Sequence, residues 1–63
     1  MKKIQLAYQY ARMMNVINYG KELTNEQVSN PNFMKHLQSI AWRYSVIELE
    51  NLIVDCRRKL AVK

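Results

Sequence analysis

Residues 31–60, PNFMKHLQSIAWRYSVIELENLIVDCRRKL, form nearly half of the chain and decide its fold. Asn30 and Pro31 are a strong helix start, because Asn is a good N-cap and Pro has its φ angle already set at the first helical position. No Gly or Pro follows within the stretch, and residues 57–59 are all cations, which interact favourably with the C-terminal end of a helix dipole. The stretch therefore predicts helical structure along its whole length.

The apolar residues of this stretch fall into two stripes when about 100° is taken per residue. One stripe comprises Phe33, Leu37, Ile40, Tyr44 and Ile47. The other stripe, roughly opposite, comprises Trp42, Val46, Leu49, Ile53, Cys56 and Leu60. The apolar face changes sides partway along, so both sides need apolar cover, and we do not expect one other helix of the same chain to supply it.

Two interpretations explain the change of sides. A single helix over 31–60, about 45 Å long at 1.5 Å per residue, can bury one side near its start and the other near its end. Alternatively the chain bends at Ser45, where Ser45 and Glu48 form a capping box and Tyr44 and Leu49 stand where a hydrophobic staple would close it. We favour the continuous helix, because no helix-breaking residue is present and capping boxes also occur by chance inside helices.

Residues 2–19 predict the first helix, since apolar side chains occupy about half of the helical circumference. Ala7 and Ala11 lie one turn apart and allow a neighbouring helix to approach closely. Gly20 follows in the position where a left-handed C-cap is common. The pattern predicts that the helix ends there.

The connection over 21–30 contains its own helical turn. Thr24 and Gln27 form a capping box, and Leu23 and Val28 are spaced for its hydrophobic staple. We expect one short turn that ends before Ser29-Asn30-Pro31.

We predict an all-α fold: a helical hairpin with a long second helix. Residues 1–63 form a single domain, and two copies are expected to assemble as a homodimeric bundle. A chain of 63 residues has a barely sufficient core. Cys56 and His36 are the only residues of their types, so neither an intramolecular disulfide nor a Cys/His metal cluster is available, and Cys56 is expected to be a buried free thiol. Oligomerisation remains, and the interface expected is the stripe of Trp42, Val46, Leu49, Ile53, Cys56 and Leu60.

Composition argues against catalysis and against membrane insertion. His36 has no Ser or Cys partner in a recognisable motif, and one glycine cannot build a phosphate-binding loop. We predict no catalytic residue, no cofactor and no metal. The chain also lacks an apolar signal segment and any run near the roughly 20 residues that span a bilayer. We therefore expect a cytoplasmic protein that acts by binding.

A partner-binding face is predicted on the first helix, where Tyr8, Arg12, Asn15 and Tyr19 share a stripe away from the Ala7 and Ala11 side. Tyr and Arg dominate binding hot spots because they combine large contact area with directed polar groups. The alternative is that the two tyrosines pack their rings over the long helix and keep only their hydroxyls in water.

Nucleic-acid binding is the alternative function. The net charge is +5, and its one dense region is the C-terminal set of Arg57, Arg58, Lys59 and Lys63. A helix-turn-helix is disfavoured, since its first helix would be a single turn and residues 31–34 offer few groups that read base edges. An RNA-binding helical dimer needs no such motif.

In length and layout the chain resembles the plasmid copy-number RNA-binding hairpin proteins. The length, the start Met1-Lys2-Lys3 and the compact helical chain without catalytic residues also resemble the small early regulatory proteins of lambda-like temperate phages, encoded in the exonuclease–excisionase region. This second resemblance implies a non-enzymatic protein in a bacterial host cell that alters host physiology or the lysis–lysogeny choice by binding an unknown host or phage protein. It transfers no functional residues.

Overall fold

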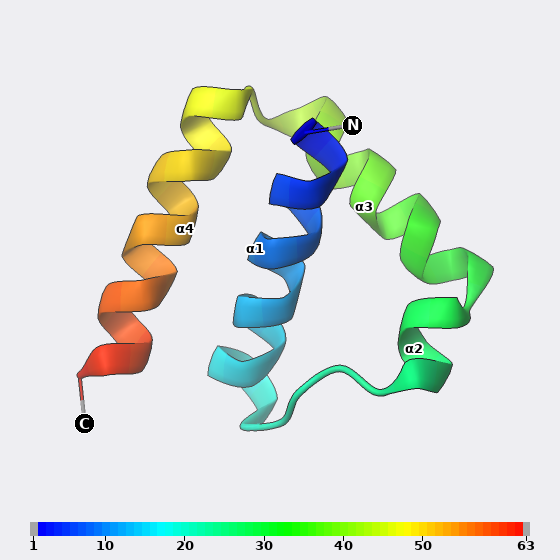
Figure 1. Cartoon of the computed structure of the whole chain (residues 1–63), viewed down its shortest axis with the longest axis horizontal. Helices are drawn as coiled ribbons and strands as arrows, with labels where there is room; N and C mark the ends of the chain where they lie inside the picture. The colour runs from blue at the N-terminus through cyan, green and yellow to red at the C-terminus, as the bar shows by residue number, and fades with distance from the viewer. Residues whose placement is uncertain (1, 63) are drawn as a thin grey trace.

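The computed structural model describes residues 2–62, which form four helices. They are α1 (Lys2–Tyr19), α2 (Asn25–Ser29), α3 (Pro31–Arg43) and α4 (Val46–Ala61). In Figure 1, α1 lies in the middle and α4 runs along one side of it. On the other side, the C-terminal part of α3 crosses the N-terminal end of α1. The predicted all-α class is confirmed.

The end of α1 is set by Gly20. Its φ of +68° lies in the left-handed region, and its N–H donates to the carbonyl of Val16 at 2.8 Å. Glycine reaches this conformation without steric cost, and the hydrogen bond satisfies one of the unpaired carbonyls at the helix end. The first helix therefore has the bounds that the sequence predicts.

The helical turn predicted inside the connection is α2. The Gln27 N–H donates to Thr24 Oγ1 at 3.2 Å, and the Thr24 N–H donates back to Gln27 Oε1 at 2.9 Å. Asn30 then caps α3, because its Oδ1 accepts from the Asn32 N–H at 2.9 Å. The capped turn and the Asn30 cap are confirmed, although α2 includes Ser29, before which the turn was expected to end.

The favoured continuous helix over 31–60 is wrong, and the alternative with a bend at Ser45 is correct. Tyr44 and Ser45 have extended backbone, with φ/ψ of −124°/146° and −77°/170°. The Glu48 N–H donates to Ser45 Oγ at 3.2 Å, and the Ser45 N–H donates to Glu48 Oε1 at 3.0 Å. These reciprocal bonds satisfy the backbone groups that a helix break would otherwise leave unpaired.

The bend turns both apolar stripes toward the same helix. Within the described residues, α3 and α4 each pack on α1 and not on each other. The buried side chains are Ala7, Ala11, Leu37, Ile40, Leu49, Ile53 and Cys56. One helix of the same chain, α1, therefore covers the buried members of both stripes, contrary to the expectation, whereas Trp42 and Ile47 stay 91% and 70% exposed. Since the small residues Ala7 and Ala11 let the other helices come close, α1 serves both.

The resulting molecule is flat. Its principal extents are 33 × 28 × 15 Å. With α1 sandwiched between α3 and α4, two broad faces and the outer sides of α3 and α4 remain open to solvent (Figure 1).

Candidate interaction surface

The predicted partner stripe on α1 is largely used inside the chain. The ring of Tyr8 is half-buried and meets Phe33 of α3 edge to face, with centroids 6.1 Å apart and an interplanar angle of 90°. Asn15 Nδ2 donates to the carbonyl of Lys21 at 2.7 Å. Tyr8 thus packs on another helix, as the alternative interpretation proposed, and Asn15 holds the connection after Gly20.

Arg12 and Tyr19 complete that stripe. Arg12 Nε donates to Glu22 Oε2 at 3.0 Å in an ion pair whose two side chains are exposed. The hydrogen bond and charge of Glu22 raise the pKa of Arg12. Tyr19 remains 73% exposed. Of the four residues, Tyr19 is the one whose exposed side chain makes no ring contact, hydrogen bond or ion pair with the rest of the described chain.

Three members of the predicted dimer interface lie in the core of the single chain. Leu49, Ile53 and Cys56 are buried within one chain, with Leu49 in the same cluster as Ala7 and Ala11. The Cys56 thiol lies 3.8 Å from the sulfur of Met14 on α1, and burial raises its pKa. These three residues contact α1 and are not available to a second chain. Cys56 is a buried free thiol, as predicted.

The other members of the predicted interface are more accessible. Val46 is half-buried, Leu60 is 39% exposed and Trp42 is 91% exposed.

Tyr44, between α3 and α4, is partly buried, because its ring packs against that of Tyr10 with centroids 6.2 Å apart and an interplanar angle of 73°. Burial, followed by the proximity of Tyr44, raises the pKa of Tyr10. The contact between Tyr10 and Tyr44 packs the corner between α3 and α4 against α1, whereas Trp42 stays exposed to solvent.

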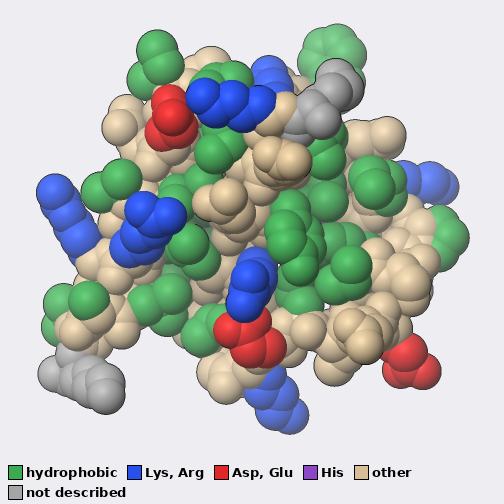
Figure 2. Space-filling model, viewed as in Figure 1, with side chains coloured by type: hydrophobic (Ala, Val, Ile, Leu, Met, Phe, Trp, Pro, Cys, Tyr) green, Lys and Arg blue, Asp and Glu red, His purple; other side chains and the backbone are tan. Residues whose placement is uncertain are grey.

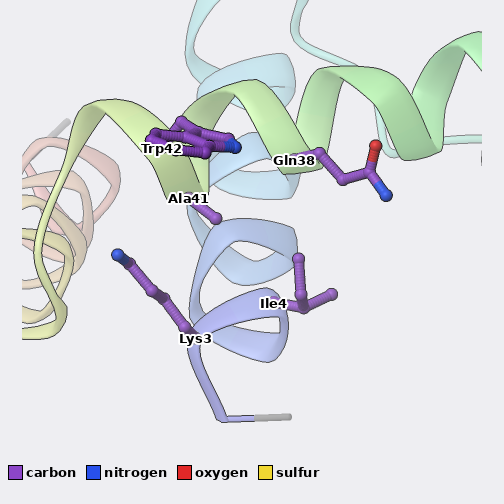
Figure 3. Close-up of a pocket in the computed structure, with 5 residues that line it drawn as sticks. All are labelled: Lys3, Ile4, Gln38, Ala41 and Trp42. Atoms are coloured by element: carbon purple, nitrogen blue, oxygen red, sulfur yellow. The ribbon is translucent and has the colours of Figure 1, made fainter.

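Trp42 borders an open groove where the N-terminal turn of α1 crosses the C-terminal part of α3. The groove has a volume of about 830 Å³ and is lined by Lys3, Ile4, Gln38, Ala41 and Trp42. Figure 3 shows the indole lying along the outer side of α3, with the Lys3 side chain rising toward it and Ile4 beneath Gln38 and Ala41. Apolar walls with an amine and an amide at the edge are suited to a bulky apolar side chain. We call these five residues the Trp42 groove.

Sequence reasoning found Trp42 but missed the rest of this groove. Lys3 and Ile4 lie far from Trp42 in sequence, and only the crossing of α1 and α3 brings them together. A signal was nevertheless present: once the helix breaks at Ser45, Trp42 no longer shares a stripe with Leu49. It then stands opposite Leu37 and Ile40 on α3 and must face away from the core.

The predicted nucleic-acid residues lie at the end of α4. Arg57, Arg58 and Lys59 are exposed, and Lys63 lies outside the described residues. On the face drawn in Figure 2 the positive side chains are scattered among hydrophobic ones rather than gathered in one patch. That face offers no continuous track for a phosphate backbone.

Neither a metal centre nor a membrane helix is found in residues 2–62. No three His, Cys, Asp or Glu side chains gather there closely enough to hold a metal ion. None of the helices is both long enough and apolar enough to cross a bilayer. His36 is exposed on α3.

Comparisons of this chain with protein-family models, with curated proteins and with solved structures find no significant match.

Proposed function

We propose that this chain is a non-enzymatic regulatory protein that works as a homodimer and acts through protein–protein contacts. The observation that carries the proposal is the large surface that the flat fold leaves in water. Because the three long helices pack side by side, the core of one chain stays small. A second subunit is the remaining way to bury more apolar surface.

The surface area can be compared with that of compact monomers. A monomer of 7.5 kDa is expected to expose about 4,250 Å² from the scaling of surface with mass, whereas this chain exposes 4999 Å². The excess is about 750 Å². A standard protein interface buries roughly 800 Å² per partner, so the excess equals what one such interface covers.

The exposed apolar side chains also support the proposed homodimer. Trp42 is 91% exposed and Ile47 is 70% exposed, on either side of the α3–α4 corner. The radius of gyration is 11.6 Å, against about 10.6 Å for a compact chain of this length. Both features fit a chain that is completed by association.

The regulatory part of the proposal comes from the resemblance to small early phage proteins. A homodimer without catalytic groups would act in the cytoplasm of a bacterial host by holding an unknown host or phage protein. Tyr19, the exposed member of the predicted partner stripe, is the first residue to test for that contact.

Light scattering over a range of protein concentrations tests the homodimer. We expect a mass twice the 7.5 kDa of the chain at micromolar concentration, retained at high salt, because an apolar interface does not depend on counterions. A mass of one chain at every concentration and salt would refute the proposal.

Nucleic-acid binding is the second candidate, and the exposure of Arg57, Arg58 and Lys59 favours it. Among the described residues the one ion pair is Arg12–Glu22, so these three cations are not neutralised by such a pair there. Anisotropy of a labelled RNA hairpin separates the candidates. Binding that weakens steeply with added salt and is lost on changing all three residues to Gln would support phosphate recognition.

A further inference from the structure

We propose that the Trp42 groove is the contact between the two subunits, and that a second copy of this chain occupies it. The inference rests on the proposed homodimer and names its surface. In each copy the Trp42 ring would enter the groove of the other copy, between Lys3, Ile4 and Ala41. It replaces the buried α4 stripe expected from the sequence.

The side chain of Trp42 is almost fully exposed. A tryptophan can bury 150–250 Å² (roughly), more than almost any other side chain, and it is enriched at interfaces for that reason. Here 91% of the residue's surface is in water, while Leu37 and Ile40 of the same helix are buried. Trp42 contributes little to the core of its own chain, so its apolar surface is available to a partner.

Trp42 and the groove belong to one surface of the chain. Trp42 forms one wall of the groove, whose volume of about 830 Å³ can accept an aromatic ring. A two-fold axis beside Trp42 places each ring over the other groove, as an isologous contact requires. Every favourable contact is then made twice.

The composition of the groove fits this occupant. Ile4 and Ala41 contribute apolar side chains to the groove, and Lys3 and Gln38 contribute an amine and an amide, a mixture of apolar and polar groups that interfaces also show. The Lys3 ammonium group can lie against the indole of the other copy in a cation–π contact. Among residues 2–62 no carboxylate lines the groove to favour a cationic ligand instead.

The exposed area and the net charge of each chain also bear on this contact. One tryptophan and one groove account for a substantial part of the excess surface of about 750 Å² per chain, taken against the surface–mass scaling of monomers. Each chain carries a net charge of +5, so two copies repel at long range. Added salt screens that repulsion, so the dimer is expected to tighten as the salt concentration rises.

The test measures the dimer dissociation constant by sedimentation equilibrium, together with indole fluorescence. Trp42 is the only tryptophan, so its emission reports on this site alone. In the wild-type protein we expect emission to move to shorter wavelength as concentration rises through the dissociation constant. Trp42→Ala is expected to weaken association by at least roughly a hundredfold, as loss of an aromatic hot spot does.

Two further variants keep the test decisive. Gln38→Lys changes an exposed residue of α3, so the core of the chain should be unaffected. It places a second cation beside Lys3 in the groove, and this added charge should also weaken the dimer. Tyr19→Ala removes another exposed aromatic ring, far from the groove at the end of α1, and should leave the dissociation constant unchanged. Thermal unfolding followed by circular dichroism checks that each variant keeps its helices.

The outcomes separate the two proposals. A dimer that persists unchanged in Trp42→Ala and Gln38→Lys, with water-exposed indole emission in the wild type, would overturn this inference and leave the homodimer standing. A wild-type protein that stays monomeric would overturn both. A dimer lost in both groove variants and retained in Tyr19→Ala would support both.

Discussion

At the scale of single residues, Ser45 decides how the chain is divided. Its hydroxyl accepts the Glu48 N–H at 3.2 Å and its N–H donates to the Glu48 carboxylate at 3.0 Å. These bonds stabilise a break between α3 and α4 that contains neither Gly nor Pro. At this break the chain changes direction, so that Trp42 faces solvent while Leu49 is buried against α1.

Replacing Ser45 by Ala should destabilise the fold by about 1 kcal/mol, the usual cost of losing an N-cap side chain. Ser45→Asp is the matched control, because aspartate accepts the same backbone N–H and should remain close to wild type. Urea unfolding of the three proteins measures the difference. Equal stability of Ser45→Ala and wild type would show that the cap contributes nothing.

Glu48 makes the same cap dependent on pH. Its hydrogen bonds with Ser45, to the backbone first, lower the pKa of its carboxyl below the ordinary 4.5. A lowered folded-state pKa contributes stability above the unfolded value, and that contribution is lost as the pH falls through the folded value. Unfolding free energy should therefore decrease as the pH falls below about 4.5.

Glu48→Gln tests this dependence, because glutamine also completes a capping box but does not titrate. The stability of this variant should fall less steeply than that of the wild type over the same acidic range. Parallel pH profiles for the two proteins would assign the acid sensitivity to other carboxylates.

At the scale of the helices, α1 holds the fold together because it contacts both α3 and α4. Leu49 of α4 is fully buried, in the same cluster as Ala7 and Ala11 of α1. Leu49→Ala should cost roughly 2–5 kcal/mol, the range for truncating a buried leucine. A domain of this size has a total stability of about 3–9 kcal/mol, so the variant should be partly or wholly unfolded at room temperature.

Ile47→Ala is the control for that prediction. Ile47 lies on the same helix but is 70% exposed, so its truncation should change the free energy of unfolding by no more than about 0.5 kcal/mol in one chain. Chemical denaturation at low protein concentration compares the two. Similar effects at both positions would mean that α4 is not packed on α1 through Leu49.

The helices show which features the sequence can predict. The caps at Gly20, Thr24 and Asn30 were predictable because each depends on groups within four residues along the chain. The choice between one helix and two at Ser45 depended instead on whether α1 could cover both apolar stripes. That property follows from the packing around Ala7 and Ala11, which a periodic pattern does not reveal.

The candidate site likewise combines features that the sequence predicts with features that depend on the fold. Helical spacing correctly places Tyr8 and Arg12 on one side of α1, but their partners Phe33 and Glu22 are known only from the fold. The Trp42 groove was not predictable as a unit, since it combines the start of α1 with the end of α3. Treating residues 31–60 as one helix also assigned Trp42 to the stripe of Leu49.

At the scale of the whole molecule, the flat shape is the observation that supports the proposed second subunit. Extents of 33 × 28 × 15 Å leave a high ratio of surface to volume, and the exposed indole is the largest apolar group on that surface. Association through the Trp42 groove would reduce the exposed area without any change in the core of either chain.

Small-angle X-ray scattering on the wild-type protein tests this account most directly, because it reports mass and shape together. At high micromolar concentration the account predicts a forward scattering that corresponds to twice the 7.5 kDa of the chain. The radius of gyration should be about 14 Å, the value for a compact particle of doubled length. A forward scattering equal to one chain, with a radius close to the 11.6 Å of the single subunit, would contradict it.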